Sequence, residues 1–255
     1  MDRASFTTQG RNLNLWTWLR LPGVRLGKLD FHLILLPSLI WIMAGAARPY
    51  VLGAPCFDNS NLCDVSELLA IDRPVPEWRS ETAEDISLIT QYVTGAFLVF
   101  VPIGIHGART YLGMISPAVA LSLAVTDITI IAQTVLWNGA LMETARVGFQ
   151  RPRPFVYGDH IAAENPSHYT SFYSGHTSFV ASASMAIFLI LFSRFKVSGM
   201  QGTLLAGFLF SHTVVTGLMR VLNARHFVTD VLFAMFMGFL VALVIGRIHK
   251  RKEPR

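Results

Sequence analysis

Six apolar blocks, separated by short polar connections, constrain this chain more than any other feature of its sequence. They cover residues 32–47, 86–106, 111–137, 174–192, 203–219 and 227–248. A helix that crosses the hydrocarbon core of a bilayer needs about 20 apolar residues, and about 17 to 25 are tolerated. Because 52% of the residues are hydrophobic and 15% are charged, too little polar sequence remains to coat six such helices in water. The sequence therefore predicts an all-α, polytopic membrane protein with six transmembrane helices, and not a soluble helical core.

The basic residues are distributed unevenly between alternate connections. With the N-terminus placed in the cytoplasm, the cytoplasmic segments carry 13 of the 21 Lys and Arg residues. Cytoplasmic segments of membrane proteins hold an excess of positive charge, so this bias predicts that both termini are cytoplasmic. The net charge of +5 accordingly indicates membrane orientation and not nucleic-acid binding.

We expect three parts in the chain. Residues 1–30 form a cytoplasmic segment without a cleavable signal peptide, which either lies flat on the membrane or frays; 31–248 form the six-helix domain; 249–255 form a basic cytoplasmic tail. Within the domain, 48–85 form an acidic non-cytoplasmic loop that holds both cysteines. In an oxidising compartment Cys56 and Cys63 can form a small disulfide loop; otherwise they are two thiols.

Three polar motifs stand at the ends of the apolar blocks. They are Arg146-Val-Gly-Phe-Gln-Arg-Pro-Arg153-Pro154, Ser174-Gly175-His176 and Arg220-x5-His226-x3-Asp230. In the predicted topology all three face away from the cytoplasm. Distant parts of the sequence are therefore expected to form one site at the non-cytoplasmic membrane interface.

The first motif suits a phosphate. A guanidinium stays charged at any relevant pH and donates paired hydrogen bonds to anionic oxygens. Pro152 and Pro154 favour an extended chain that points successive arginines in fixed directions. We interpret Arg146 and Arg153 as phosphate ligands, and Arg151 as an arginine that anchors the chain in the headgroup region.

The other two motifs supply further anion-binding groups and the reactive ones. The start of a helix offers free N–H groups to an anion, and Gly175 lets the backbone approach a ligand closely. Taken alone, Ser-Gly-His is a weak signal. Asp230 follows His226 by four residues; on one helix these share a face, so the carboxylate is expected to orient the imidazole and stabilise its positive form. An imidazole held in this way presents its other nitrogen as a nucleophile.

The order and spacing of these residues resemble the type 2 phosphatidic acid phosphatase family, which includes bacterial acid phosphatases and is similar to vanadium haloperoxidases. The family motifs Lys-x6-Arg-Pro, Pro-Ser-Gly-His and Ser-Arg-x5-His-x3-Asp correspond to Arg146-x6-Arg153-Pro154, Tyr173-Ser174-Gly175-His176 and Met219-Arg220-x5-His226-x3-Asp230. Arg146, Tyr173 and Met219 depart from the family residues without removing a reacting group. The resemblance covers about residues 86–248.

The resemblance implies a role for each residue. His226 attacks phosphorus, Asp230 holds His226, and His176 protonates the leaving alcohol and then activates water. The phosphate ligands are expected to be Arg146, Arg153, Ser174, Gly175 and Arg220. No metal and no other cofactor is expected, because the arginines supply the positive charge.

Other polar residues carry weaker hypotheses. Asp127 lies within an apolar block and either has a function or pairs with another helix. Asn138 and Glu143 either contact a lipid headgroup or Arg146. We interpret His106 and His212 as structural.

These features predict an enzyme of a bacterial inner membrane whose site faces the periplasm. It is expected to be a metal-independent phosphatase that acts on a lipid phosphomonoester or diphosphate, and not on nucleic acid. The substrate stays open between a phospholipid such as phosphatidic acid or phosphatidylglycerol phosphate, an isoprenyl diphosphate and a phosphorylated glycolipid. A lipid phosphotransferase is the nearest alternative, because water and an acceptor alcohol use the same residues. A non-enzymatic anion transporter would have polar or broken helices near the midplane.

Overall fold

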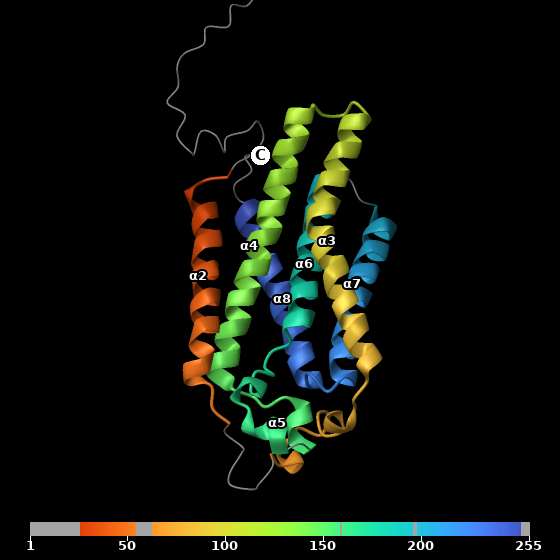
Figure 1. The fold of residues 1–255 in the computed structure, drawn as a ribbon. Coiled ribbons are helices and arrows are strands. Elements are labelled where there is room, and N and C mark those ends of the chain that lie inside the picture. The colour runs from red at the N-terminus through yellow and green to blue at the C-terminus, as the bar shows by residue number, and fades with distance from the viewer. Residues whose placement is uncertain (1–25, 55–62, 159, 196–197, 251–255) are drawn as a thin grey trace, which may run out of the picture.

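The computed structural model describes residues 26–54, 63–158, 160–195 and 198–250. Six long helices run side by side (Figure 1): α2 (Lys28–Val51), α3 (Glu81–Tyr111), α4 (Pro117–Phe149), α6 (Gly175–Arg194), α7 (Gly199–Leu222) and α8 (Val228–Lys250). The short helix α5 (His160–Glu164) lies at one end of this bundle. The 3₁₀ turns η1 (Val65–Glu67), η2 (Val75–Glu77), η3 (Pro154–Gly158) and η4 (Pro166–His168) complete the described elements, none of which is a strand.

Within the described residues, six helices are long and apolar enough to cross a membrane. The prediction of an all-α polytopic membrane protein with six spans is therefore confirmed. Large apolar side chains such as Ile42, Phe100 and Leu204 stay at least 66% exposed on α2, α3 and α7. Such a surface suits lipid, because a soluble chain rarely leaves large contiguous apolar areas in water.

The observed bounds of the third long helix differ from those of the apolar block 111–137. Helix α4 starts at Pro117, where the ring fixes the first helical φ angle and the Ser116 hydroxyl accepts a hydrogen bond from the Val119 N–H. It continues to Phe149, because polar Asn138 and Glu143 find partners in neighbouring helices and so do not end it. The helix thereby carries Arg146 into the site.

Helix α6 packs against α3, α4, α7 and α8. Most of its buried residues are small, among them Ala181, Ser182 and Ala183, and this lets neighbouring backbones approach closely. The approach is tightest at Gly238 of α8, where an added Cβ would lie 2.7 Å from the Ala181 Cβ and 2.8 Å from the Ser178 carbonyl oxygen. This central helix begins at the second motif and holds it rigidly.

Part of the predicted chain division falls outside the described residues, namely most of the N-terminal segment and the last five residues of the basic tail. Cys56 lies outside them as well, whereas Cys63 is disulfide-bonded. The division into cytoplasmic and non-cytoplasmic parts stays a prediction.

Candidate active site

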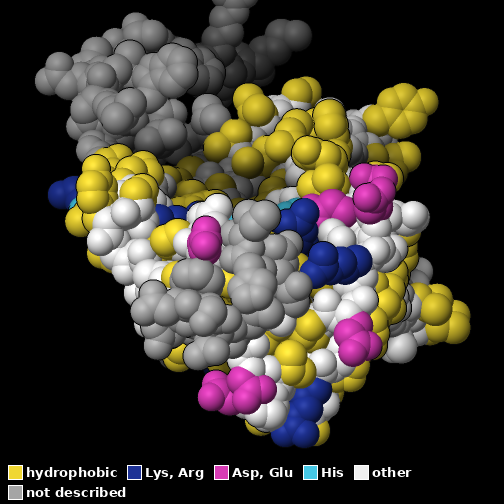
Figure 2. Space-filling model, turned by 60° about the horizontal axis from the view of Figure 1, so that its bottom comes forward, with side chains coloured by type: hydrophobic (Ala, Val, Ile, Leu, Met, Phe, Trp, Pro, Cys, Tyr) yellow, Lys and Arg dark blue, Asp and Glu magenta, His cyan; other side chains and the backbone are white. Residues whose placement is uncertain are grey.

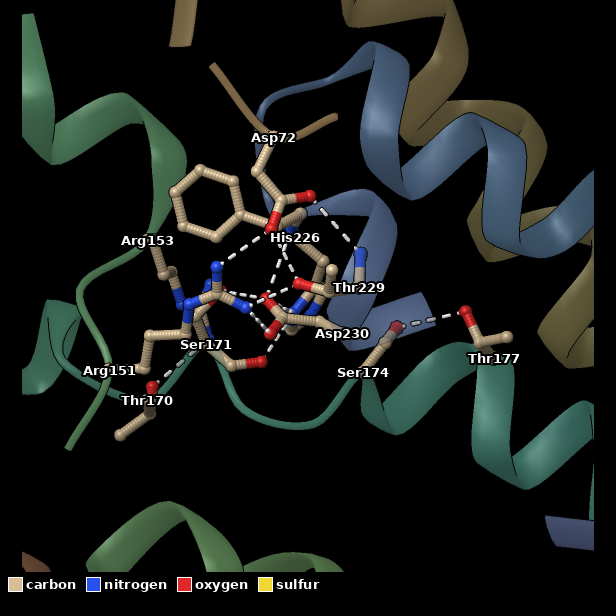
Figure 3. Close-up of polar contacts among 11 residues, drawn as sticks. Asp72, Arg151, Arg153, Thr170, Ser171, Ser174, Thr177, His226, Thr229 and Asp230 are labelled. Carbon is tan, nitrogen blue, oxygen red and sulfur yellow. Dashed lines mark hydrogen bonds and ion pairs between the residues drawn. The ribbon is translucent and has the colours of Figure 1, made fainter. Parts of the chain in front are cut away.

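The three motifs meet at one end of the bundle, where α4 and α7 end and α6 and α8 begin (Figure 1). The segment after α4 reaches α8 through Arg151, whose Nη1 lies 2.5 Å from Asp230 Oδ1. The segment before α6 reaches the same place through the Ser171 carbonyl oxygen, 2.7 Å from His226 Nδ1. Figure 3 shows these residues together, and Figure 2 shows basic and acidic side chains gathered on this end of the molecule.

His226 lies in the turn before α8 and is 1% exposed. A carbonyl oxygen only accepts hydrogen bonds, so the contact with Ser171 requires the proton of the neutral ring on Nδ1 and leaves a lone pair on Nε2. The pKa of His226 is well below its ordinary value of 6.5, because burial disfavours the charged ring and Arg153, Arg220 and Arg146 add positive charge nearby. His226 is therefore a neutral imidazole with an available nucleophilic nitrogen.

Asp230 does not hold His226 by a direct hydrogen bond: its Oδ2 lies 3.9 Å from Nδ1. The predicted direct contact assumed that both residues share a helix, but α8 begins at Val228, after His226. Instead, Asp230 Oδ2 accepts hydrogen bonds from the Ser171 hydroxyl at 2.5 Å and from the Phe227 N–H at 3.0 Å. Asp230 is thus linked to His226 through Ser171, whose carbonyl oxygen contacts the imidazole, and through Phe227, the next residue of the chain.

The interpretation of Arg151 as a headgroup anchor is wrong. Its guanidinium donates to Asp230 and also, from Nη2, to Asp72 Oδ2 at 2.9 Å (Figure 3). Its carbon Cζ lies 4.2 Å from the centre of the Phe227 ring. Arg151 therefore belongs to the group of side chains that packs around His226 and Asp230.

Asp72 is a site residue that sequence reasoning missed. It is fully buried and accepts hydrogen bonds from the N–H of Thr229 at 3.2 Å and from its hydroxyl at 2.5 Å, so it ties the 48–85 segment to the start of α8. Two carboxylates share the single guanidinium of Arg151. This group carries a net negative charge beside His226, and such a charge favours a positive imidazole during a reaction. The only sequence signal for this role of Asp72 was its location in the acidic segment 48–85.

The three predicted arginines each make a few protein contacts. Arg146 Nη1 donates to Glu143 Oε1 at 3.1 Å, and Arg153 Nη2 donates to the Thr170 hydroxyl at 3.3 Å. Arg220 Nη1 donates to Glu84 Oε2 at 2.8 Å and to the Ser87 hydroxyl at 3.1 Å. Each interaction fixes a guanidinium without using all of its donors.

Four nitrogens of this site are buried and contact no hydrogen-bond partner within the described residues. They are Nε of Arg146, Arg153 and Arg220, and Nε2 of His176. Leaving one buried donor unpaired costs about 1 to 3 kcal/mol, and more when the group is charged. Several such nitrogens in one place indicate a site that is completed by an anionic ligand.

Ser174 and Gly175 connect the first two motifs. Ser174 precedes the first helical residue of α6, and its hydroxyl oxygen lies 2.9 Å from the Thr177 hydroxyl oxygen. A Cβ on Gly175 would lie only 2.8 Å from Arg146 Nη2. Glycine therefore lets the Arg146 guanidinium rest against the start of α6, where helix N–H groups also attract anions.

Tyr173, Glu143 and Glu84 contact the motif residues or the helices that carry them. Tyr173, in place of the family proline, is 1% exposed and its hydroxyl donates to the Asn138 carbonyl oxygen at 3.3 Å, so it serves packing. Glu143 contacts Arg146, one of the two predicted options, and also forms an ion pair with Arg48 of α2. Glu84 pairs with Arg220 and was not singled out from the sequence.

The fold and the site define an integral membrane protein with a cationic, histidine-containing anion site at one end of its helices. A family model described as the PAP2 superfamily matches residues 120–254, which is more than half of the chain and includes all three motifs. The chain belongs to the PAP2 superfamily, as the motif resemblance predicted, and this membership supports phosphatase-type activity. No curated protein and no solved structure matches the chain.

Proposed function

We propose that this protein is a lipid phosphatase that hydrolyses a phosphomonoester or diphosphate of a lipid headgroup through a phosphohistidine on His226. The observation that carries the proposal is the neutral imidazole of His226, which lies among three arginines whose Nε atoms are buried and have no partner among the described residues. This arrangement supplies a nucleophile and preorganised donors for the charge of a transferring phosphoryl group. Its position at the end of six apolar helices suits a substrate held in the bilayer.

In the first step, the lone pair of His226 Nε2 forms a bond to phosphorus while the bond from phosphorus to the leaving oxygen breaks. His176 donates a proton to that oxygen, so the lipid leaves as an alcohol or, from a diphosphate, as a monophosphate. The imidazole becomes positive, and the net negative charge of Asp72, Asp230 and Arg151 favours this state.

In the second step, water attacks phosphorus and the phosphorus–nitrogen bond breaks. His176 accepts the proton of the water, inorganic phosphate leaves, and His226 returns to its neutral form. The arginines bear the negative charge throughout, so we propose that the reaction needs no metal ion.

Phosphate release from purified lipids tests this function. With EDTA present, the protein should release phosphate from at least one of phosphatidic acid, phosphatidylglycerol phosphate, an isoprenyl diphosphate and a phosphorylated glycolipid. Vanadate should inhibit release, because it adopts the five-coordinate geometry of the transition state. Strict dependence on Mg²⁺ would count against the mechanism. A phosphorylated product that forms only when a second alcohol is added would identify a phosphotransferase instead.

The orientation of the site is also part of the proposal: the site faces the periplasm of a bacterial inner membrane, and both termini are cytoplasmic. Glu164→Cys places a thiol on α5 at the site end, and Met114→Cys places one on the exposed connection of the opposite end. An impermeant maleimide added to spheroplasts should label only the first, and permeabilisation should expose the second. The unsubstituted chain reports background labelling. The opposite pattern would place the site on the cytoplasmic side.

A further inference from the structure

A pocket of about 330 Å³ lies beside the candidate active site. It is formed by the end of α2, by the η4 turn and by one residue of the segment before α6. Its lining residues are Arg48, Pro49, Leu52, Asn165, Pro166, Ser167 and Thr170. None of them belongs to the three sequence motifs.

Two residues connect this pocket to the phosphate ligands. The Thr170 hydroxyl accepts a hydrogen bond from Arg153 Nη2 at 3.3 Å. Arg48 forms an ion pair with Glu143, whose other carboxylate oxygen accepts from Arg146 Nη1 at 3.1 Å. The pocket is therefore one residue away from two of the arginines that would bind the transferring phosphoryl group.

The chemistry of the pocket favours an anion. Arg48 is the one charged residue of its lining, and its Nε is buried without a hydrogen-bond partner in the described parts of the chain. Glu143 is shared by Arg48 and Arg146, so one carboxylate faces two guanidiniums and a net positive charge remains. The hydroxyls of Ser167 and Thr170 already donate to Asn165 Oδ1 at 2.7 Å and to the Ser167 carbonyl oxygen at 3.0 Å, so Arg48 supplies the donors for phosphate oxygens.

We propose that this pocket is a second anion subsite, in which Arg48 binds a phosphate that stays on the leaving group while the phosphoryl group beyond it is transferred to His226. The inference rests on the proposed phosphatase function and narrows its substrate class to lipids with two phosphate groups. Arg48 thus determines specificity and is not a reacting group. The second phosphate is either joined directly, as in an isoprenyl diphosphate, or lies beyond a spacer, as in phosphatidylglycerol phosphate.

The ratio of kcat/KM between substrates with two phosphates and with one tests this subsite. One pair is farnesyl diphosphate and farnesyl phosphate; the other is phosphatidylglycerol phosphate and phosphatidic acid. Arg48→Gln should lower the ratio about 10- to 100-fold, as loss of one charged hydrogen bond does. The pair that responds identifies the source of the second phosphate. Arg79→Gln, which removes an exposed arginine at the same end of the molecule, should leave both ratios unchanged.

A second variant separates binding from positioning, because Arg48 also contacts the partner of Arg146. Ser167→Phe should fill the pocket without altering the Arg48, Glu143 and Arg146 contacts, and it should lower the same ratio. An equal loss for both members of each pair in Arg48→Gln would mean that Arg48 only positions Arg146. That result, or an unchanged ratio in Ser167→Phe, would overturn the subsite.

Binding of a non-hydrolysable diphosphate needs no turnover and so separates this inference from the proposed function. The wild-type protein should bind methylenediphosphonate about tenfold or more tightly than inorganic phosphate, and Arg48→Gln should lose that advantage. Equal affinity of the wild-type protein for the two anions would exclude a directly joined second phosphate, and an unchanged phosphatidylglycerol phosphate ratio in Arg48→Gln would then overturn the subsite. A wild-type protein that releases phosphate from no lipid would overturn the phosphatase function, whereas the binding result would still decide the subsite.

Discussion

Histidine, aspartate and arginine side chains lie together at each end of the helix bundle, but the two ends use them differently. At the end opposite the candidate active site, Asp127 Oδ2 lies 2.8 Å from His106 Nε2. Its Oδ1 accepts from Arg194 Nη2 at 2.7 Å and from Nε at 3.2 Å. This opposite cluster, His106–Asp127–Arg194, joins α3, α4 and α6 around one carboxylate.

At the site end, the Nε atoms of Arg146, Arg153 and Arg220 are all buried without partners in the described residues, whereas the Nε of Arg194 is paired. A guanidinium that pairs with a buried carboxylate has a structural role, since breaking the pair would leave an uncompensated buried charge. Guanidiniums with unsatisfied donors need an anion to complete them. We therefore infer that Asp127, whose role the sequence left open, pairs neighbouring helices.

The largest expected effect is the difference in turnover between substitutions of the two buried histidines, His226 and His106. His226→Ala should reduce turnover by at least about 10³-fold, because removal of a nucleophile eliminates the covalent route. His106→Ala should instead lower the thermal stability of the purified protein and keep kcat of the folded fraction within about threefold, since its partners only join helices. Phosphate release and thermal unfolding in detergent measure both quantities. Near-normal turnover of correctly inserted His226→Ala protein would refute the nucleophile.

Substitutions of an arginine at each end should likewise differ, with one affecting turnover and the other affecting stability. Arg153→Ala removes one preorganised donor and should lower kcat about 10²- to 10³-fold without loss of stability, because an unpaired buried charge disappears. Arg194→Ala leaves Asp127 with an incompletely compensated charge and should destabilise the fold, with little effect on kcat. If Arg153→Ala destabilised the protein as strongly as Arg194→Ala, the contrast between the two ends would not hold.

A smaller effect on turnover is expected at Asp72, which pairs with Arg151 at the site end. Asp72→Asn keeps the size of the side chain but removes one of two carboxylates that face Arg151, so the charge that favours a positive His226 is weakened. We expect kcat to fall about tenfold while KM stays nearly constant, the pattern of an interaction that strengthens only in the transition state. Asp127→Asn is the matched control at the opposite end. A change in KM alone for Asp72→Asn would assign the residue to substrate binding.

The sequence located the motif residues better than the contacts that surround them. Apolar block length identified the six helices, and motif spacing brought His176, Arg153 and His226 to one end of them. The role of Asp230 depends on where α8 begins, and a two-residue difference there changes which groups face each other. Asp72 could not be found by spacing, because it lies 157 residues from its partner Thr229 in a segment without periodicity.

The smallest expected effect is a pH dependence of stability that distinguishes His226 from an exposed histidine. The folded-state pKa of His226 lies well below its ordinary value of 6.5, chiefly because the ring is buried. Between those two values the unfolded chain binds a proton that the folded chain excludes, so folding stability is fully present above pH 6.5 and is lost as the pH falls below it.

Thermal unfolding of the metal-free protein in detergent, followed from pH 7.5 to pH 5, measures this loss. For a chain of this size each 1 kcal/mol of lost stability lowers Tm by about 2 to 4 °C. His226→Ala should flatten the decline of Tm below pH 6.5, because the group that gains a proton on unfolding is gone. His32→Ala, at an exposed position of α2, should retain the wild-type decline. An equally steep decline in His226→Ala would mean that the imidazole is already protonated in the folded protein, and the neutral nucleophile would have to be abandoned.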